Sequence, residues 1–430
     1  MSVTYPKGFS AAGVAAGLKK SGGKDVAVVV NTGERVAAAA VFTPNRFAAA
    51  PVQWSRQAIA ASAARGAVPV AVVLNSGGAN ACTGATGQQH AARTARRAAD
   101  ALGLGDASEV LVCSTGLIGE LLPIEAVCAG VERALVEAGP AAGGESAAEA
   151  ILTTDTHPKT ATAEATTGTG ASMISTEAST IGAATDTQGA PTTRAATTES
   201  EGGAYRVGGM AKGAGMLAPA LATMLVVVTT DAVLDNATAQ AALAEACRTT
   251  FNRIDSDGCM STNDTVILLA SGASGAAPTP DEFTATLTTV CADLARQLIG
   301  DAEGASHDIR VEVVNAATED GALEVARAIA RSNLLKAAIF GNDPNWGRVL
   351  AAAGTVPPEV AAFDPDRVDV SINGVMVCLG GGVGADRGLV DLTPREVSIV
   401  VDLHAGDQAV TLWTNDLTHD YVHENSAYSS

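Results

Sequence analysis

Aromatic and basic residues are scarce in this chain of 430 residues. Phe, Trp and Tyr make up 3% of the sequence, whereas Gly occurs 45 times, so the core has to be built from small aliphatic side chains at close spacing. Lys and Arg total 27 against 46 Asp and Glu, which gives a formal net charge of −19. A surface of that sign repels phosphate backbones and anionic membranes. We therefore expect neither nucleic acid nor a membrane among the partners.

Long apolar runs and metal-binding motifs are also missing. No window reaches the roughly 18 to 20 apolar residues that a membrane span needs, and the first residues show no secretion signal. The seven cysteines never form C-x-x-C, which argues against a disulfide framework and a zinc cluster. The six histidines form no H-E-x-x-H, and no G-x-S-x-G occurs. The sequence predicts a cytoplasmic protein with no metal and no bound cofactor.

Apolar runs that end in glycine loops and continue into helical spacing recur along the chain. Residues 67–76 read as a strand followed by a glycine loop, and residues 84–104 have helical spacing. The segments 25–47 and 396–417 each read as two strands around a turn, which predicts hairpins. The pattern predicts an α/β or α+β layered sandwich of sheets and helices with substantial antiparallel sheet.

A segment rich in Thr, Ala, Gly and Ser interrupts this alternation of strands, glycine loops and helices at about residues 160–203. It has few large apolar side chains and cannot bury enough surface to offset the entropy cost of ordering throughout. We expect most of it to be a surface insert.

Thr223 stands between a glycine-rich, proline-containing stretch and the strongly β-forming run 224–232. A threonine hydroxyl is a weak nucleophile unless a base lies beside it, and no histidine suits that role. If the bond between Ala222 and Thr223 is cut, the freed α-amine lies within reach of the hydroxyl of the same residue. An α-amine titrates near pH 7.7 to 8.0, where a general base works well. From the pattern alone, an ordinary strand residue remains the alternative.

The sequence closely resembles the ornithine acetyltransferase family of arginine biosynthesis, whose members are glutamate N-acetyltransferases. The matching motifs occur in the family's order over nearly the whole chain and are LNSGGANACTG, CSTGLIG, ILTTDT, KGAGMLAPALATMLVVVTTDA, STNDTVILLASG, FGNDPNWGRVLAAAG and YVHENSAYSS. Between ILTTDT and KGAGM the family usually has a shorter connection than this chain.

The resemblance implies a self-processing acyltransferase of the N-terminal-nucleophile-like type, as in ornithine acetyltransferases and the DmpA aminopeptidase. Cleavage between Ala222 and Thr223 would give an α chain of residues 1–222 and a β chain of residues 223–430. Thr223 would then take the acetyl group from N2-acetylornithine, release ornithine and pass the acetyl group to glutamate in a ping-pong cycle.

The resemblance also implies the residues of the site. It assigns the stabilisation of the oxyanion to Thr115 and Gly116, which follow an apolar strand in a glycine loop. Substrate contacts fall on six residues, namely Thr153, Lys212, Thr223, Glu303, Asn425 and Ser430. Taken alone, the charged members of this set would more often be solvated surface residues.

Several alternatives stay open at this stage. A related self-processing aminopeptidase or amidohydrolase would share the nucleophile and use water as acceptor. An acetyltransferase of a specialised pathway would share the motifs, and an uncleaved binding protein would not use them for catalysis. The sequence leaves open whether acetyl-CoA is also a donor, and the resemblance implies an assembly of two α and two β chains.

Overall fold

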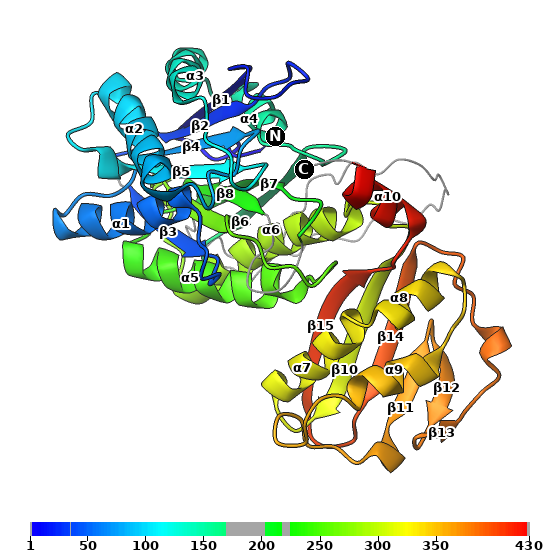
Figure 1. The fold of residues 1–430 in the computed structure, drawn as a ribbon. Coiled ribbons are helices and arrows are strands. Elements are labelled where there is room, and N and C mark those ends of the chain that lie inside the picture. The colour runs from blue at the N-terminus through cyan, green and yellow to red at the C-terminus, as the bar shows by residue number, and fades with distance from the viewer. Residues whose placement is uncertain (1, 35, 169–202, 217–223, 428–430) are drawn as a thin grey trace, which may run out of the picture.

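The structure is a computed structural model that describes residues 2–34, 36–168, 203–216 and 224–427. Ala222, Thr223 and Ser430 lie outside these residues, as does most of the Thr-rich segment. The described chain forms three β-sheets with helices on their faces (Figure 1). Within this part of the chain, no helix has both the length and the apolar character needed to cross a membrane.

The first sheet has four strands in the order β1-β2-β4-β5. β4 and β5 run parallel, whereas β1 and β4 each run antiparallel to β2. Three of the strands are buried along their whole length, as continuous runs of Val, Ala and Leu predict. The bounds are β1 (Phe9–Val14), β2 (Val26–Asn31), β4 (Ala71–Ser76) and β5 (Val110–Thr115).

The second sheet has five strands in the order β3-β9-β8-β7-β6. β8 and β9 are parallel, and the other neighbours are antiparallel. The bounds are β3 (Ala37–Phe42), β6 (Lys159–Thr166), β7 (Ala204–Lys212), β8 (Leu225–Thr230) and β9 (Thr265–Ala270).

These two sheets pack face to face, and helices cover both outer faces (Figure 1). The central core joins side chains of both sheets, such as Val29, Leu74, Val227 and Ile267. α2 (Gly84–Leu102) and α3 (Ile124–Glu137) cover the first sheet, and α5 (Asn236–Thr249) and α6 (Pro280–Gly300) cover the second. The four layers confirm the predicted α/β sandwich.

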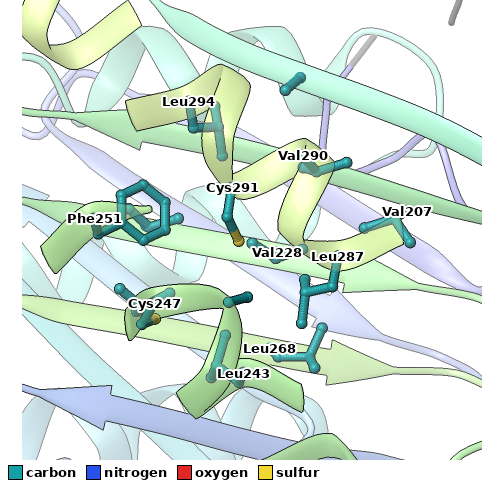
Figure 2. Packing of buried hydrophobic residues seen from close by; sticks show 14 of the residues in the cluster. Val207, Val228, Leu243, Cys247, Phe251, Leu268, Leu287, Val290, Cys291 and Leu294 are labelled. Atoms are coloured by element: carbon teal, nitrogen blue, oxygen red, sulfur yellow. The ribbon is translucent and has the colours of Figure 1, made fainter. Parts of the chain in front are cut away.

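The packing under α5 and α6 shows how small aliphatic side chains fill a core that has few aromatic rings. Leu243 of α5 and Leu287 of α6 pack over Val228 and Leu268 of the second sheet (Figure 2). All four side chains are fully buried. Two further helices, α1 (Ala50–Ala64) and α4 (Gly143–Ala150), pack against β5 and against β1 and β2 respectively.

A third sheet of six strands forms a separate layer with its own core in the order β13-β12-β11-β14-β10-β15. The strands are β10 (Asp308–Ala316), β11 (Asp369–Ile372), β12 (Val375–Leu379), β13 (Gly382–Val383), β14 (Glu396–Asp402) and β15 (Gln408–Asn415). Its helices are α7 (Glu319–Ala330), α8 (Asn333–Phe340) and α9 (Trp346–Ala353). After β15 the chain returns towards the first two sheets in α10 (His419–Ala427; Figure 1).

Both predicted hairpins are wrong. β2 and β3 are neighbours in the sequence but belong to different sheets, so the turn between them crosses the sandwich. β14 and β15 lie on opposite sides of β10, which separates them. The Thr-rich insert also begins later than predicted, because residues 159–166 form β6 and pair with β7. The rest of that insert, residues 169–202, lies outside the described residues.

Candidate active site

The predicted oxyanion residues lie at the carboxyl end of β5, against the glycine turn that follows β4. The carbonyl oxygen of Thr115 accepts hydrogen bonds from the N–H groups of Gly77 and Gly78, both at 3.0 Å. Gly116 has φ of +129°, and a Cβ atom there would lie 2.5 Å from the nitrogen of Gly78. Only glycine fits this conformation and this approach. Among the described residues, the N–H of Gly116 meets no acceptor, so it is free to serve a ligand.

The start of β8 follows directly on the predicted nucleophile and is held by Asp264. The N–H of Met224 donates to Oδ1 of Asp264 at 3.0 Å. The Asp264 side chain is fully buried, and burial raises the pKa of its carboxyl group well above the ordinary value. Its other oxygen, Oδ2, has no hydrogen-bond partner among the described residues. A buried carboxyl group with a raised pKa therefore lies next to the junction at which cleavage is predicted.

Lys212 ends β7 opposite Leu225 of β8 and connects the two sheets. Its Nζ donates to Oγ1 of Thr153 at 2.7 Å and to Oγ1 of Thr115 at 3.3 Å. The residue is only 2% exposed, so it is not a solvated surface charge. Burial lowers the pKa of the Lys212 ammonium group, and the carboxylate of Asp155 opposes that shift.

Glu303 lies at a second, acidic end of the site. Its carboxylate accepts hydrogen bonds from Oγ1 of Thr154 at 2.7 Å and from Nδ2 of Asn425 at 3.1 Å. Its backbone N–H donates to the carbonyl of Ala214 at 2.9 Å. A Cβ atom on Gly215 would lie 2.6 Å from the Glu303 carboxylate, so glycine at 215 permits this approach.

The structure thus brings the described members of the predicted site together from distant parts of the chain. The loop 153–155 joins the ends, because Thr153 contacts Lys212 and the next residue, Thr154, contacts Glu303. A cationic end and an anionic end lie on either side of this loop. Such an arrangement suits a small molecule that carries a carboxylate and an ammonium group.

The sequence interpretation missed Asp155, Lys159 and Asp264. Asp155 and Lys159 are four positions apart with opposite charges, which is a weak signal that solvated surface residues share. In the structure their side chains are fully buried and their charged atoms lie 2.7 Å apart. No pattern in the sequence shows that this pair is buried, because its burial depends on segments far away in the chain.

The structure also has a cavity of about 370 Å³ beside the start of α2. Its lining includes Arg46, Gln53, Cys82 and Gln88, and contains none of the predicted site residues. The cavity therefore contributes nothing to the arrangement around Lys212 and Glu303.

Comparison with known proteins agrees with the motifs. The ArgJ family model matches residues 10–183 and 171–430, and its two matches overlap within the Thr-rich segment. The arginine biosynthesis bifunctional proteins ArgJ of Streptomyces coelicolor and Bifidobacterium longum are 58% and 52% identical to the chain, over all of both chains in each case. A solved structure of ornithine acetyltransferase complexed with ornithine, from Mycobacterium tuberculosis, is 40% identical over 51% of this chain and 94% of that chain, with a TM-score of 0.38. The family predicted from the motifs is confirmed, and the chain belongs to the ArgJ family.

Proposed function

We propose that this protein transfers an acetyl group from N2-acetylornithine to glutamate in arginine biosynthesis, after it has cleaved itself between Ala222 and Thr223. Membership of the ArgJ family supports the reaction. The observation that carries the proposal is the pair of oppositely charged ends, Lys212 and Glu303, on either side of the loop 153–155. N2-acetylornithine has an α-carboxylate for the first end and a δ-ammonium group for the second.

The chemistry follows from the chain's own groups. The α-amine of Thr223, once freed, takes the proton of the Thr223 hydroxyl, and the hydroxyl oxygen attacks the acetyl carbonyl. Ornithine leaves with a proton on its α-nitrogen, and the acetyl group stays on Thr223 as an ester. The uncharged α-amine of glutamate then attacks that ester, the bond between the acetyl carbon and the Thr223 oxygen breaks, and the proton lost from the glutamate nitrogen restores the Thr223 hydroxyl. Each attack forms a tetrahedral oxyanion, which the Thr115 hydroxyl and the Gly116 N–H stabilise.

Glutamate has to use the same site in the second half-reaction, and its side chain ends in a carboxylate instead of an ammonium group. Lys212 suits the α-carboxylate of both substrates. Asn425 has an amide group that can donate to a carboxylate or accept from an ammonium group, and it already contacts Glu303. Asn425 is therefore suited to both side chains.

The proposal is tested by mixing the purified protein with N2-acetylornithine, with and without glutamate, and measuring ornithine and N-acetylglutamate by mass spectrometry. Acetyl transfer predicts ornithine release that depends on glutamate. Release that ignores glutamate would establish the hydrolase alternative. The same sample with acetyl-CoA as donor tests the second activity that the word bifunctional in the relatives' names suggests.

The Thr223→Ala variant tests the nucleophile. We expect it to remain a single chain near 42.8 kDa on a denaturing gel and to release no ornithine, because both the attacking oxygen and the cleavage chemistry are lost. Two fragments with retained turnover would contradict the assignment.

We further expect the active enzyme to be cytoplasmic and to consist of two α and two β chains. Native mass spectrometry measures the number of chains in the assembly directly.

A further inference from the structure

The carboxylate of Asp155 is the point at which several segments of the site meet. Oδ1 accepts from the N–H of Gly213 at 2.6 Å and from Nζ of Lys159 at 2.7 Å. Oδ2 accepts from the N–H of Thr153 at 3.1 Å and lies 3.7 Å from Nζ of Lys212. The side chain is fully buried, so water does not weaken these interactions. Asp155 thus holds the backbone of Thr153, the turn after β7 and the Lys212 ammonium group at once.

An ammonium group has three hydrogens to donate and no lone pair to accept with. In their hydrogen bonds to Lys212, the hydroxyl oxygens of Thr115 and Thr153 therefore act as acceptors. Each hydroxyl keeps its own hydrogen, and among the described residues neither donates it to a protein acceptor. Both hydrogens are free for the substrate or the oxyanion. A neutral Lys212 amine has a lone pair that could accept from these hydroxyls. The hydroxyl hydrogens could then point to Lys212 instead of to the substrate.

The charge of Lys212 depends on its surroundings because the group is buried. Burial lowers the pKa of Lys212, Asp155 raises it most among the charged neighbours, and Lys159 lowers it. The other titratable groups that act on this ammonium group from the packed segments are Lys19, Asp264 and Glu303. Burial also disfavours the charged form of Asp155, but the two lysines overcome this and hold the pKa of that carboxyl group below its ordinary value.

We propose that Asp155 is a positioning residue of the acetyl-transfer site, which keeps Lys212 as an ammonium ion so that the hydroxyl hydrogens of Thr115 and Thr153 point to the substrate. The inference rests on the proposed function for the identity of the reaction. It differs from a purely structural ion pair between Asp155 and Lys159, in which loss of the carboxylate lowers stability without altering how activity depends on pH.

Two double variants separate these roles, since each removes one buried lysine and one buried carboxylate. Nζ of Lys159 lies 2.5 Å from Oδ2 of Asp301, so Asp301 is the matched partner of Asp155. Asp155→Asn with Lys159→Gln removes the carboxylate beside Lys212. Asp301→Asn with Lys159→Gln leaves it in place. Thermal unfolding of both shows whether each variant folds.

The first readout is the pH profile of kcat. An opposite charge at this range is worth about 1 to 3 pKa units. Both double variants lack Lys159, whose charge lowers the pKa of Lys212, so they differ in whether the carboxylate beside Lys212 is present. Compared with the Asp301 variant, the variant without Asp155 should therefore lose activity at an alkaline limit that is lower by about 1 to 3 pH units. The Asp301 variant should not show the downward shift. Equal alkaline limits in the two double variants would overturn the inference.

The second readout does not depend on turnover. The chain has only seven lysines, so ¹³Cε-lysine NMR can follow each titration, with Lys212 assigned by its loss in Lys212→Arg. The Lys212 signal should titrate at lower pH in the Asp155 variant than in the Asp301 variant. Unchanged titration would refute the inference even if acetyl transfer is confirmed. If the wild type shows no glutamate-dependent release of ornithine, the proposed function fails and a role in acetyl transfer fails with it.

The single variant Lys159→Gln provides a test with one change if the Asp155 variant does not fold. It leaves Asp155 with Lys212 as its nearest cation, and removes a charge that lowers the pKa of Lys212. The alkaline limit of activity and the Lys212 titration should both move to higher pH. A shift of neither, or a shift to lower pH, would overturn the inference.

Discussion

At the scale of single residues, the proposed oxyanion donor Gly116 has a backbone conformation that only glycine fits. Its φ of +129° and the 2.5 Å that would separate a Cβ atom from the nitrogen of Gly78 leave no room for a side chain. We expect Gly116→Ala to lower kcat by about 100-fold, as loss of one oxyanion donor does, with a smaller change in KM. Steady-state kinetics with N2-acetylornithine and glutamate measure both constants.

Gly119→Ala is the matched control for this prediction. Gly119 also has a positive φ, of +86°, but a Cβ atom there meets no atom within 4 Å. The control has backbone strain without the clash against the glycine turn. Equal losses in the two variants would attribute the effect to strain alone, and full kcat in Gly116→Ala would exclude this loop from the oxyanion site.

The site residues divide into those that the sequence could predict and those that it could not. Thr115, Gly116 and Lys212 lie in motifs of the family, and Glu303 was assigned through the resemblance to the family. The structure brings these four residues to one place. Asp155 also lies in a family motif, ILTTDT, but that motif led to a role for Thr153 alone. The contacts of Asp155 with Lys159 of β6, with Lys212 of β7 and with Gly213, and the complete burial of its side chain, exist only in the folded chain. Burial of a charged side chain is a property of the folded chain, and the residues next to it in the sequence do not determine it.

At the scale of elements, the sequence predicted which segments are strands better than it predicted their partners. The runs that form β4, β5, β8 and β9 are continuous and apolar, so the sequence alone was enough to predict that they are strands. The partners were wrong where a turn looks local but the strands diverge. β10 enters between β14 and β15 from about 80 residues earlier in the chain, and no short-range pattern reports such an insertion.

The position of α10 depends on a glycine in the loop that carries Glu303. Gly304 has φ of +62°, and a Cβ atom there would lie 2.2 Å from the backbone nitrogen of Tyr421. We expect Gly304→Ala to displace α10 and the Asn425 amide that contacts Glu303. Because Asn425 and Glu303 are proposed to bind the substrate side chain, the KM for N2-acetylornithine should rise several-fold, by about 1 kcal/mol for one lost hydrogen bond. Titration of the rate against substrate measures it.

Gly103→Ala is the control for this element. Gly103 caps α2 with φ of +68°, and a Cβ atom there meets nothing within 4 Å. Its substitution should lower the thermal stability slightly and leave KM unchanged. An unchanged KM in Gly304→Ala would show that α10 does not contribute to the substrate site.

At the scale of the whole molecule, the predicted cleavage lies between two neighbouring strands of one sheet. β7 ends at Lys212 and β8 begins at Leu225, and these two residues are paired in the antiparallel ladder. Strands from both sides of residue 222 also meet at one edge of this sheet, where β3 pairs with β9. The cores above and below the sheet contain residues from both sides.

A cut between Ala222 and Thr223 should therefore leave the two fragments tightly associated, because separating them would expose two apolar cores and break the ladder between β7 and β8. We expect both fragments to elute together in native size exclusion and to separate only in denaturant. A denaturing gel of each fraction tests this, with uncut Thr223→Ala as the reference for a single chain. Fragments that part under native conditions would contradict the shared core, since only a weak interface lets two halves dissociate without denaturant.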